Sequence, residues 1–318
     1  MRDENLNTEG DDNLKKAKLE TYAPMIKKED DVKNNSMKLY SYLLCISGLA
    51  IFPENTRMFR HKDLVLSKIK RCTGITDKTV KLYLYELENA GLISYMGVNM
   101  HERTLEFDRY HGDNEIYEED FIIYKDGVPK LDKDGHPKID KVAFRKAKES
   151  RAFEIWKNRN KKGVYYIPRP NPYTPIPEET LEKLISIFEL DEQELKTYIM
   201  CCIFRDVQVE HYGGKSKVLK YEDLRETLGK RGNISYTDSK IKRTLYLLKG
   251  LGLINFDDGF CYNQKGAKIP CFILTYVGYY VAYEEKEFEN ENNDEDIAIA
   301  QERLKQYDKS LFECGRCI

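Results

Sequence analysis

Two segments of the chain carry hydroxyl and basic side chains at matched positions. They are Thr76, Lys78, Thr79 and Lys81 in the first segment, and Thr237, Ser239, Lys240, Lys242 and Arg243 in the second. Lysine and arginine neutralise phosphates, and together with serine and threonine they can hydrogen-bond to base edges. The chemistry that these residue types favour is therefore non-covalent recognition of nucleic acid.

The two segments are copies of one unit. An ungapped alignment of residues 76–93 with residues 237–254 gives nine identical positions out of eighteen, namely Thr76/Thr237, Asp77/Asp238, Lys81/Lys242, Leu84/Leu245, Tyr85/Tyr246, Leu87/Leu248, Gly91/Gly252, Leu92/Leu253 and Ile93/Ile254. Unrelated segments would share about one position, so the alignment indicates an internal repeat.

Each copy is predicted to form a short helix that is followed by a strand. Thr76 and Thr237 are suitable N-caps, and Gly91 and Gly252 stand where a left-handed residue ends a helix. Apolar residues spaced i, i+4, i+7 define the buried face, namely Val80, Leu84 and Leu87 in one copy and Ile241, Leu245 and Leu248 in the other. The hydroxyl and basic residues begin the opposite face, which we expect to be free in both copies.

Further elements are predicted around the first copy. They are a helix over Met37–Ile51, a short strand at Met58–Phe59, a helix over Lys62–Cys72, and strands at Ser94–Met96 and Thr104–Phe107. This order resembles the winged helix-turn-helix class of DNA-binding proteins over Ser36–Tyr110. The resemblance implies that the repeated helix enters the major groove and that a hairpin wing, which includes Arg103, touches the flanking DNA.

A similar order surrounds the second copy. Its predicted elements are helices near Glu178, over Glu194–Phe204 and over Tyr221–Gly229, a strand at Val218–Leu219, and a wing from Ile254 to Tyr276. Lys265 and Lys268 lie at the tip of this wing, where they are placed to meet phosphate.

The fold class that follows is α+β and mainly helical, with two winged-helix domains in tandem. They are joined by an inserted hairpin and helix and by a linker that holds five of the ten prolines. The predicted divisions are a disordered leader over 1–33, the first winged-helix domain over 34–110, the insertion, basic helix and linker over 111–177, the second winged-helix domain over 178–283, and an acidic tail over 284–318.

Charge is segregated along the chain although the net charge is only −2. Between Lys141 and Lys162 there are nine basic residues against two acidic ones, Glu149 and Glu154. From Glu284 to Asp296 there are eight acidic residues against Lys286 alone. Local charge decides what a surface attracts, so an overall acidic balance does not exclude a polyanionic partner.

Other chemistries have weaker support in the sequence. Cys314 and Cys317 have the spacing of half a zinc site, which Cys261 and Cys271 could complete across the wing, but a solvent-exposed tail end is preferred. The 23 tyrosines leave a tyrosine nucleophile open, but the five histidines are scattered. The aspartates of the insertion lack the order of a calcium loop. We therefore expect no enzyme activity, no cofactor and no metal.

Apolar runs are too short to cross a membrane, so a cytoplasmic protein is expected. The tandem arrangement resembles plasmid and phage replication initiators, which implies sequence-specific binding of double-stranded DNA. A transcriptional regulator and a winged-helix protein-interaction scaffold are the alternatives. The candidate partners are double-stranded DNA, replication or transcription proteins, and a second copy of the chain.

Overall fold

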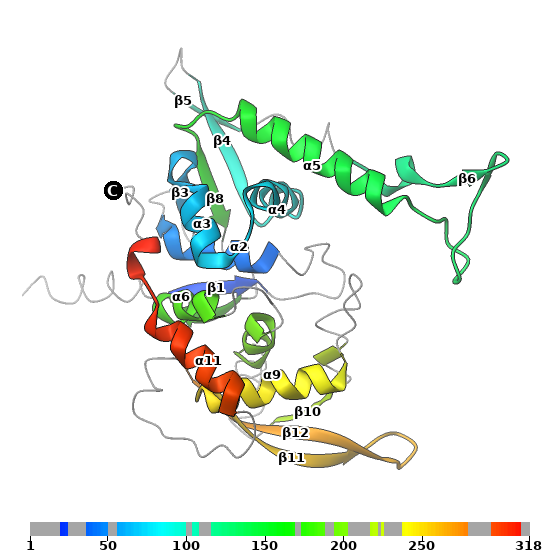
Figure 1. The fold of residues 1–318 in the computed structure, drawn as a ribbon, viewed down its shortest axis with the longest axis vertical. Helices are drawn as coiled ribbons and strands as arrows, with labels where there is room; N and C mark the ends of the chain where they lie inside the picture. The colour runs from blue at the N-terminus through cyan, green and yellow to red at the C-terminus, as the bar shows by residue number, and fades with distance from the viewer. Residues whose placement is uncertain are drawn as a thin grey trace, which may run out of the picture.

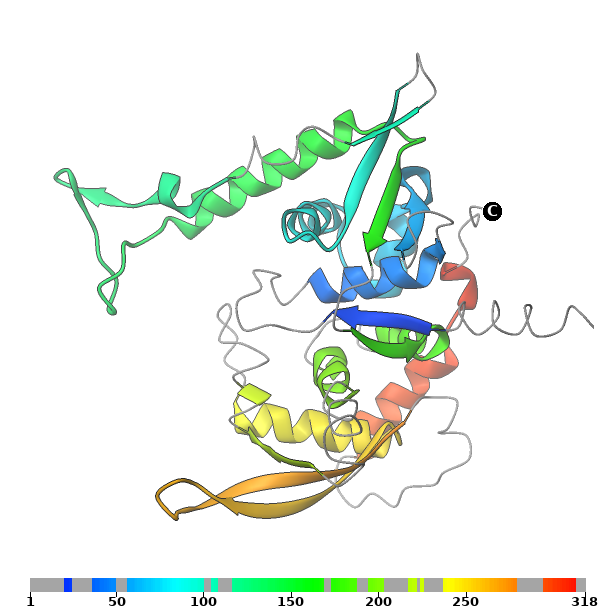
Figure 2. The ribbon, with the colours of Figure 1, turned by 180° about the vertical axis from the view of Figure 1, so that it is seen from behind.

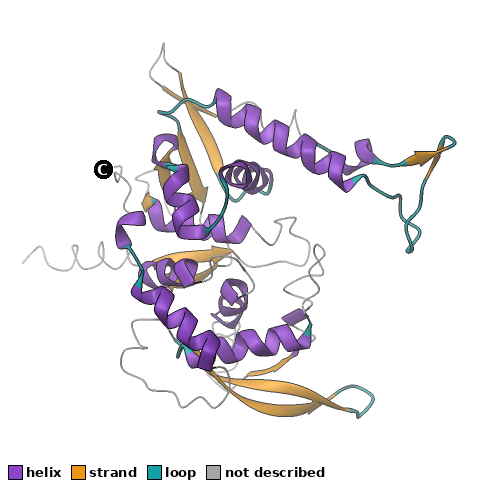
Figure 3. Cartoon of the chain, viewed as in Figure 1, coloured by secondary structure: helices purple, strands orange, loops and turns teal. Residues whose placement is uncertain are grey.

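The computed structural model describes residues 20–24, 36–49, 56–99, 104–107, 116–168, 173–187, 194–202, 217–221, 224–225, 237–278 and 294–312. The protein is α+β, with helices packed around small antiparallel sheets (Figure 3). Within these residues, no helix has both the length and the apolar character that a membrane span requires.

The repeated segments form two helices with matching ends, α4 (Asp77–Asn89) and α9 (Asp238–Gly250). Gly91 and Gly252 have φ angles of 69° and 68°, in the left-handed region that glycine tolerates. The amide of the following leucine donates back into the helix in both copies, from Leu92 to the Leu87 carbonyl and from Leu253 to the Leu248 carbonyl. The predicted start and end of both helices are confirmed.

The first unit, residues 36–168, contains the elements predicted before and after the first copy. They are α2 (Ser36–Ile46), β2 (Gly48–Leu49), β3 (Thr56–Arg60), η1 (His61–Asp63), α3 (Leu66–Thr73), β4 (Ser94–Asn99) and β5 (Thr104–Phe107). A further strand, β8 (Val164–Pro168), lies between β3 and β4 in a sheet of order β2-β3-β8-β4-β5. The prediction that the first domain ends at residue 110 is therefore wrong, because its sheet needs a strand from beyond the insertion.

The second unit, residues 194–278, has the same strand arrangement in a simpler form. Its helix over residues 194–202 is followed by β10 (Lys217–Lys220), α9, β11 (Ile254–Tyr262) and β12 (Lys268–Val277). The sheet order is β10-β12-β11, so the last strand again lies between the two earlier ones. The repeat thus extends from the helix to the sheet.

The insertion of the first unit projects from the body of the molecule (Figures 1 and 2). It contains η2 (Glu118–Phe121), the hairpin strands β6 (Tyr124–Lys125) and β7 (Val128–Pro129), and α5 (Lys141–Asn158). Asp126 and Gly127 turn the hairpin with positive φ angles of 54° and 79°, which confirms the hairpin predicted from the Asp-Gly step. Asp140 caps α5 by accepting hydrogen bonds from two amides of the first turn.

One hydrophobic core runs through both units. Between them lie α6 (Glu178–Ile187), which packs on α2, and a two-stranded sheet of β1 (Glu20–Pro24) and β9 (Tyr173–Pro177). Two predictions are corrected here. The described parts of the proline-rich segment belong to β8 and β9 rather than to a linker between separate bodies, and residues 20–24 of the predicted disordered leader form a strand.

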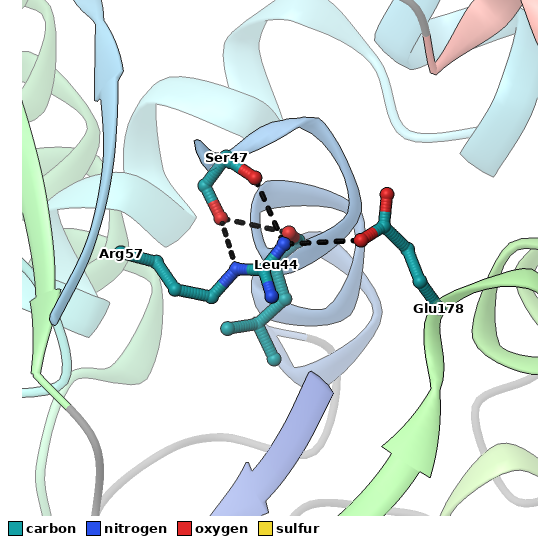
Figure 4. Close-up of polar contacts among 4 residues, drawn as sticks. All are labelled: Leu44, Ser47, Arg57 and Glu178. Carbon is teal, nitrogen blue, oxygen red and sulfur yellow. Dashed lines mark hydrogen bonds and ion pairs between the residues drawn. The ribbon is translucent and has the colours of Figure 1, made fainter. Parts of the chain in front are cut away.

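A buried ion pair also joins the first unit to α6 (Figure 4). The guanidinium of Arg57 on β3 lies 3.1 Å from the carboxylate of Glu178, the first residue of α6. Arg57 also donates to the hydroxyl of Ser47 at 2.9 Å and to the Ser47 carbonyl at 2.8 Å. These bonds satisfy an arginine whose side chain is 2% exposed.

The C-terminal segment packs on both units. Helix α11 (Asp294–Lys305) contacts α6 and α9, and η3 (Lys309–Leu311) contacts α3. The Tyr42 hydroxyl on α2 donates to the Leu311 carbonyl at 3.2 Å, and the Phe312 ring packs beside Tyr42. The prediction of an acidic tail over 284–318 is therefore wrong for residues 294–312, because their apolar side chains are part of the core.

Candidate nucleic-acid interface

The basic edge of α9 in the second unit is exposed. Ile241, Leu245 and Leu248 are buried in the core, so the other side of the helix turns outward. The side chains that the sequence singled out on this helix all reach solvent, namely Thr237, Ser239, Lys240, Lys242 and Arg243. The acidic residue among them, Asp238, is paired with Arg225 at 3.1 Å. The edge therefore presents a net positive charge at the amino-terminal end of a helix.

Tyr246 connects this helix to the wing of the second unit. Its hydroxyl donates to the carboxylate of Asp258 on β11 at 2.6 Å, and its ring packs edge-on against Phe256. The hydrogen bond to Asp258, together with partial burial, raises the pKa of Tyr246 to about 12. Tyr246 therefore packs against the β11–β12 hairpin.

The wing formed by β11 and β12 carries the two predicted tip lysines. Lys265 and Lys268 are both exposed. The turn between the strands is held by Asn263, whose side chain accepts hydrogen bonds from the amides of Lys265 and Ala267 at 3.0 and 2.8 Å. A well-ordered turn of this kind holds the lysines at a defined distance from α9.

The corresponding edge of α4 in the first unit is partly covered by α5. The Lys78 ammonium lies 2.6 Å from the Glu149 carboxylate, but the Lys78 side chain is still 71% exposed. The Lys81 ammonium lies 5.1 Å from the ring centre of Phe153 and 5.8 Å from that of Trp156, and Lys81 is half-buried. The expectation of a free face is therefore wrong at Lys81, whereas Thr76 and Lys78 are exposed. Thr76 and Thr79 hydrogen-bond to each other at 2.8 Å, and Arg103 lies outside the described residues.

Helix α5 and the loop after it expose basic side chains of their own. The exposed residues are Lys141, Arg145, Lys146, Lys157, Lys161 and Lys162. The two acids of this region are engaged, Glu149 with Lys78 and Arg145, and Glu154 with Arg151. These lysines were not predicted as contact residues, although the run of nine basic residues in the sequence was the signal that could have identified them.

A buried network fixes the end of α5 on the first unit. Arg159 forms an ion pair with Glu88 of α4, donates to the Tyr165 hydroxyl on β8 at 2.7 Å, and lies 4.4 Å from the ring centre of Tyr95. Burial alone would lower the pKa of the arginine, but the tyrosine and the carboxylate outweigh it, and the pKa is raised. The cation stays charged, so α5 is held to α4 by charge as well as by packing.

His61 lies beside this network and makes the first unit sensitive to acid. Burial, and then the charges of Arg159 and Lys161, lower its pKa from 6.5 to about 4. The unfolded chain therefore binds a proton between these values that the folded protein does not, and stability falls as the pH drops. We expect the free energy of unfolding to decrease by about 1–2 kcal/mol from pH 7 to pH 5, allowing for partial solvent access to the ring.

Urea denaturation of the protein and of His61→Gln at both pH values measures this contribution. His61→Gln lacks the group that takes up the proton on unfolding, so its free energy of unfolding should change less between pH 7 and pH 5. Equal pH dependence in the two proteins would contradict the assignment.

Among the described residues, no group of three or more histidine, cysteine or acidic side chains is arranged to hold a metal. Cys261 and Cys271 are free thiols on the paired wing strands, and burial followed by the neighbouring Cys261 raises the pKa of Cys271. Cys314 and Cys317 lie outside the described residues.

No protein-family model, no curated protein and no solved structure matches this chain. The functional argument therefore depends on the geometry of the units and on the charges that they expose.

Proposed function

We propose that the protein binds double-stranded DNA through two winged-helix units, with α9 of the second unit as the helix that enters the major groove. The observation that carries the proposal is the exposed, cationic amino-terminal half of α9, next to a wing with two exposed lysines. The order of helices and strands in each unit supports the winged-helix assignment. In that class the helix at this position reads base edges while the wing contacts the backbone.

The first unit contributes differently in this proposal. Because Lys81 packs against α5 and Lys78 is paired with Glu149, the exposed lysines of α5 would meet phosphate together with the exposed Lys78. The α5 arm and the wing of the second unit project to the same side of the molecule (Figures 1 and 2). A duplex lying on that side would have basic side chains from both units within reach.

For the biological role, we propose initiation of plasmid or phage replication in the cytoplasm, with a transcriptional regulator as the alternative. Both roles need a protein that recognises one DNA sequence. Selection of bound fragments from the source genome separates them, because an initiator should enrich repeated sites close to its own gene, whereas a regulator should enrich dispersed promoters.

The packing of α4 against α5 favours a second candidate function for the first unit alone. There the helix makes a protein contact within the chain, as a winged helix used as a scaffold would. This candidate predicts no DNA affinity above background at physiological salt.

Lys242→Glu is expected to weaken duplex binding roughly tenfold at low salt and to reduce the salt dependence of the affinity, because one phosphate contact is lost. A gel shift over a range of salt concentrations measures both effects. Lys305→Glu on α11 is the matched control, because this exposed lysine belongs to neither α9 nor the wing and its ion pair with Glu302 is at the surface. Unchanged DNA retention by both Lys240→Glu and Lys242→Glu would refute the proposal for α9.

Lys81 and Lys242 occupy the same position in the repeat, so Lys81→Glu would be expected to weaken DNA binding as Lys242→Glu does. Because the Lys81 ammonium lies over two rings of α5, we expect Lys81→Glu to act mainly by disturbing the packing of α4 on α5 instead.

A further inference from the structure

One face of the second-unit wing carries two large, exposed aromatic side chains. Phe260 and Tyr262 on β11 are 63% and 71% exposed. They are two residues apart on one strand, so their side chains lie on the same face. The residues paired with them on β12 are Pro270 and Lys268, which share that face.

These rings do not serve the core of the unit. The buried aromatic residues of this sheet, Phe256 and Phe272, lie nearer to α9 and pack against each other with a 5.7 Å separation of ring centres. It costs free energy to leave large apolar side chains in water on a projecting ribbon, so a partner is expected to cover them.

The positions of Phe260 and Tyr262 on the wing indicate which kind of contact the two rings can make with a partner. The residues at the turn of the wing, 263–267, are polar or small, and the rings stand behind them on the flat side of the ribbon. A wedge that is pushed between the base pairs of a duplex needs its apolar side chain at the leading edge. Rings on the flat side instead form a platform onto which flat groups can stack.

The spacing of the rings suits successive unpaired bases. Side chains two residues apart on a strand are separated by about 6.6–6.8 Å, which is about the distance between neighbouring bases in an extended single strand. The Lys268 ammonium lies 3.8 Å from the ring centre of Phe260, and Lys265 is exposed at the turn. Two neighbouring rings with cations beside them match a chain of bases and phosphates, whereas an apolar protein surface would leave both lysines without a counter-charge.

We propose that this face of the wing binds single-stranded DNA, with Phe260 and Tyr262 stacking on unpaired bases and Lys265 and Lys268 contacting the phosphates. The platform continues from the duplex-binding edge proposed above, since Asp258, on the same face of β11, is hydrogen-bonded to Tyr246 of α9. One unit could then hold a duplex on α9 and an opened strand on its wing. This inference goes beyond duplex binding and depends on different side chains.

The test uses the full-length protein and a fluorescently labelled oligo(dT) of about 20 nucleotides, with binding followed by fluorescence anisotropy. Phe260→Ala and Tyr262→Ala should each weaken binding of the oligonucleotide roughly 5- to 100-fold, the range seen when one stacking ring is removed. Binding of the selected duplex fragment should change less than threefold, and thermal unfolding should be unaltered because both side chains are exposed.

Two further variants separate stacking from simple apolar contact. Phe260→Leu with Tyr262→Leu retains much of the apolar area but removes the rings, and should bind oligo(dT) as weakly as the double alanine variant. Phe260→Tyr with Tyr262→Phe retains both rings and should bind like the unaltered protein.

Unchanged oligo(dT) binding by the double alanine variant, or full binding by the double leucine variant, would overturn the inference. Loss of duplex binding without loss of oligo(dT) binding would also overturn it and would favour insertion into a duplex. Lys242→Glu distinguishes this inference from the proposed function, because it should weaken binding of the duplex and leave oligo(dT) binding intact. If no variant affects the duplex while the ring variants lose oligo(dT), the single-strand site stands and the duplex proposal fails.

Discussion

Replacing Arg159 by methionine is expected to lower the free energy of unfolding by about 3–5 kcal/mol, because it leaves the carboxylate of Glu88 buried without its cation. The two side chains are 5% and 2% exposed, so water cannot take over the role of the lost partner. The same substitution removes the hydrogen bond to Tyr165 and the contact with the Tyr95 ring. Few single changes elsewhere in the described residues would leave so deeply buried a charge.

Denaturant unfolding followed by the fluorescence of Trp156 measures this effect. Trp156 is the only tryptophan in the chain, and its ring lies 4.4 Å from that of His61, next to the network. Lys157→Met is the matched control on the same helix, because Lys157 is exposed, and it should change stability by less than about 0.5 kcal/mol.

The double variant Arg159→Met with Glu88→Leu tests the cause, since removal of both charges should restore much of the lost stability. If it is as unstable as Arg159→Met alone, the loss comes from packing and not from an unpaired charge.

The helices α4 and α9 could be predicted from the sequence because their determinants are local. A threonine before each helix, a glycine after it and an apolar stripe between them fix the start, the end and the buried face within eighteen residues. The strands β4 and β5 of the first wing were predicted for the same reason. The confirmed hairpin at Asp126-Gly127 likewise needed only two residues.

The place of β8 could not be predicted in this way, because strand pairing is not local. Val164–Pro168 enters the sheet more than fifty residues after β5, and its own residues do not indicate with which strands it pairs. The five prolines between Pro168 and Pro177 suggested a linker. In the structure Pro168 is the last residue of the strand, where the missing amide hydrogen costs little.

The difference between the two repeated helices as candidate sites has an identifiable cause. The sequence treats Lys81 and Lys242 as equivalent, yet Lys81 is half-buried over two rings of α5, whereas Lys242 is exposed with its ammonium 5.5 Å from the ring centre of Tyr246 on its own helix. The partner surface on α5 consists of Glu149, Phe153 and Trp156, which are spaced i, i+4, i+7 and so share one helix face. That spacing could be recognised in the sequence, but the sequence did not indicate onto which helix this face would dock.

The ion pair between Arg57 of the first unit and Glu178 of α6 provides the second large effect. Glu178→Ala is expected to lower the free energy of unfolding by about 2–4 kcal/mol, because Arg57 would remain buried without its carboxylate. Ser47 still accepts two hydrogen bonds from Arg57, which is why the expected loss is smaller than for Arg159. Glu179→Ala is the matched control one residue along, since Glu179 is exposed and its ion pair with Lys183 lies at the surface.

The same variant tests whether the docked units act together on DNA. Units on a loose tether gain affinity through effective concentration alone, whereas units held in one orientation favour a single spacing of their target sites. Because α6 packs on α2 and α3 of the first unit and on α11, which contacts α9, we expect a strict spacing in the unaltered protein. Glu178→Ala should bind a fragment with both sites more weakly and tolerate inserted base pairs better, and Glu179→Ala should do neither. Equal sensitivity to spacing in all three proteins would mean that Arg57 and Glu178 do not fix the orientation of the units.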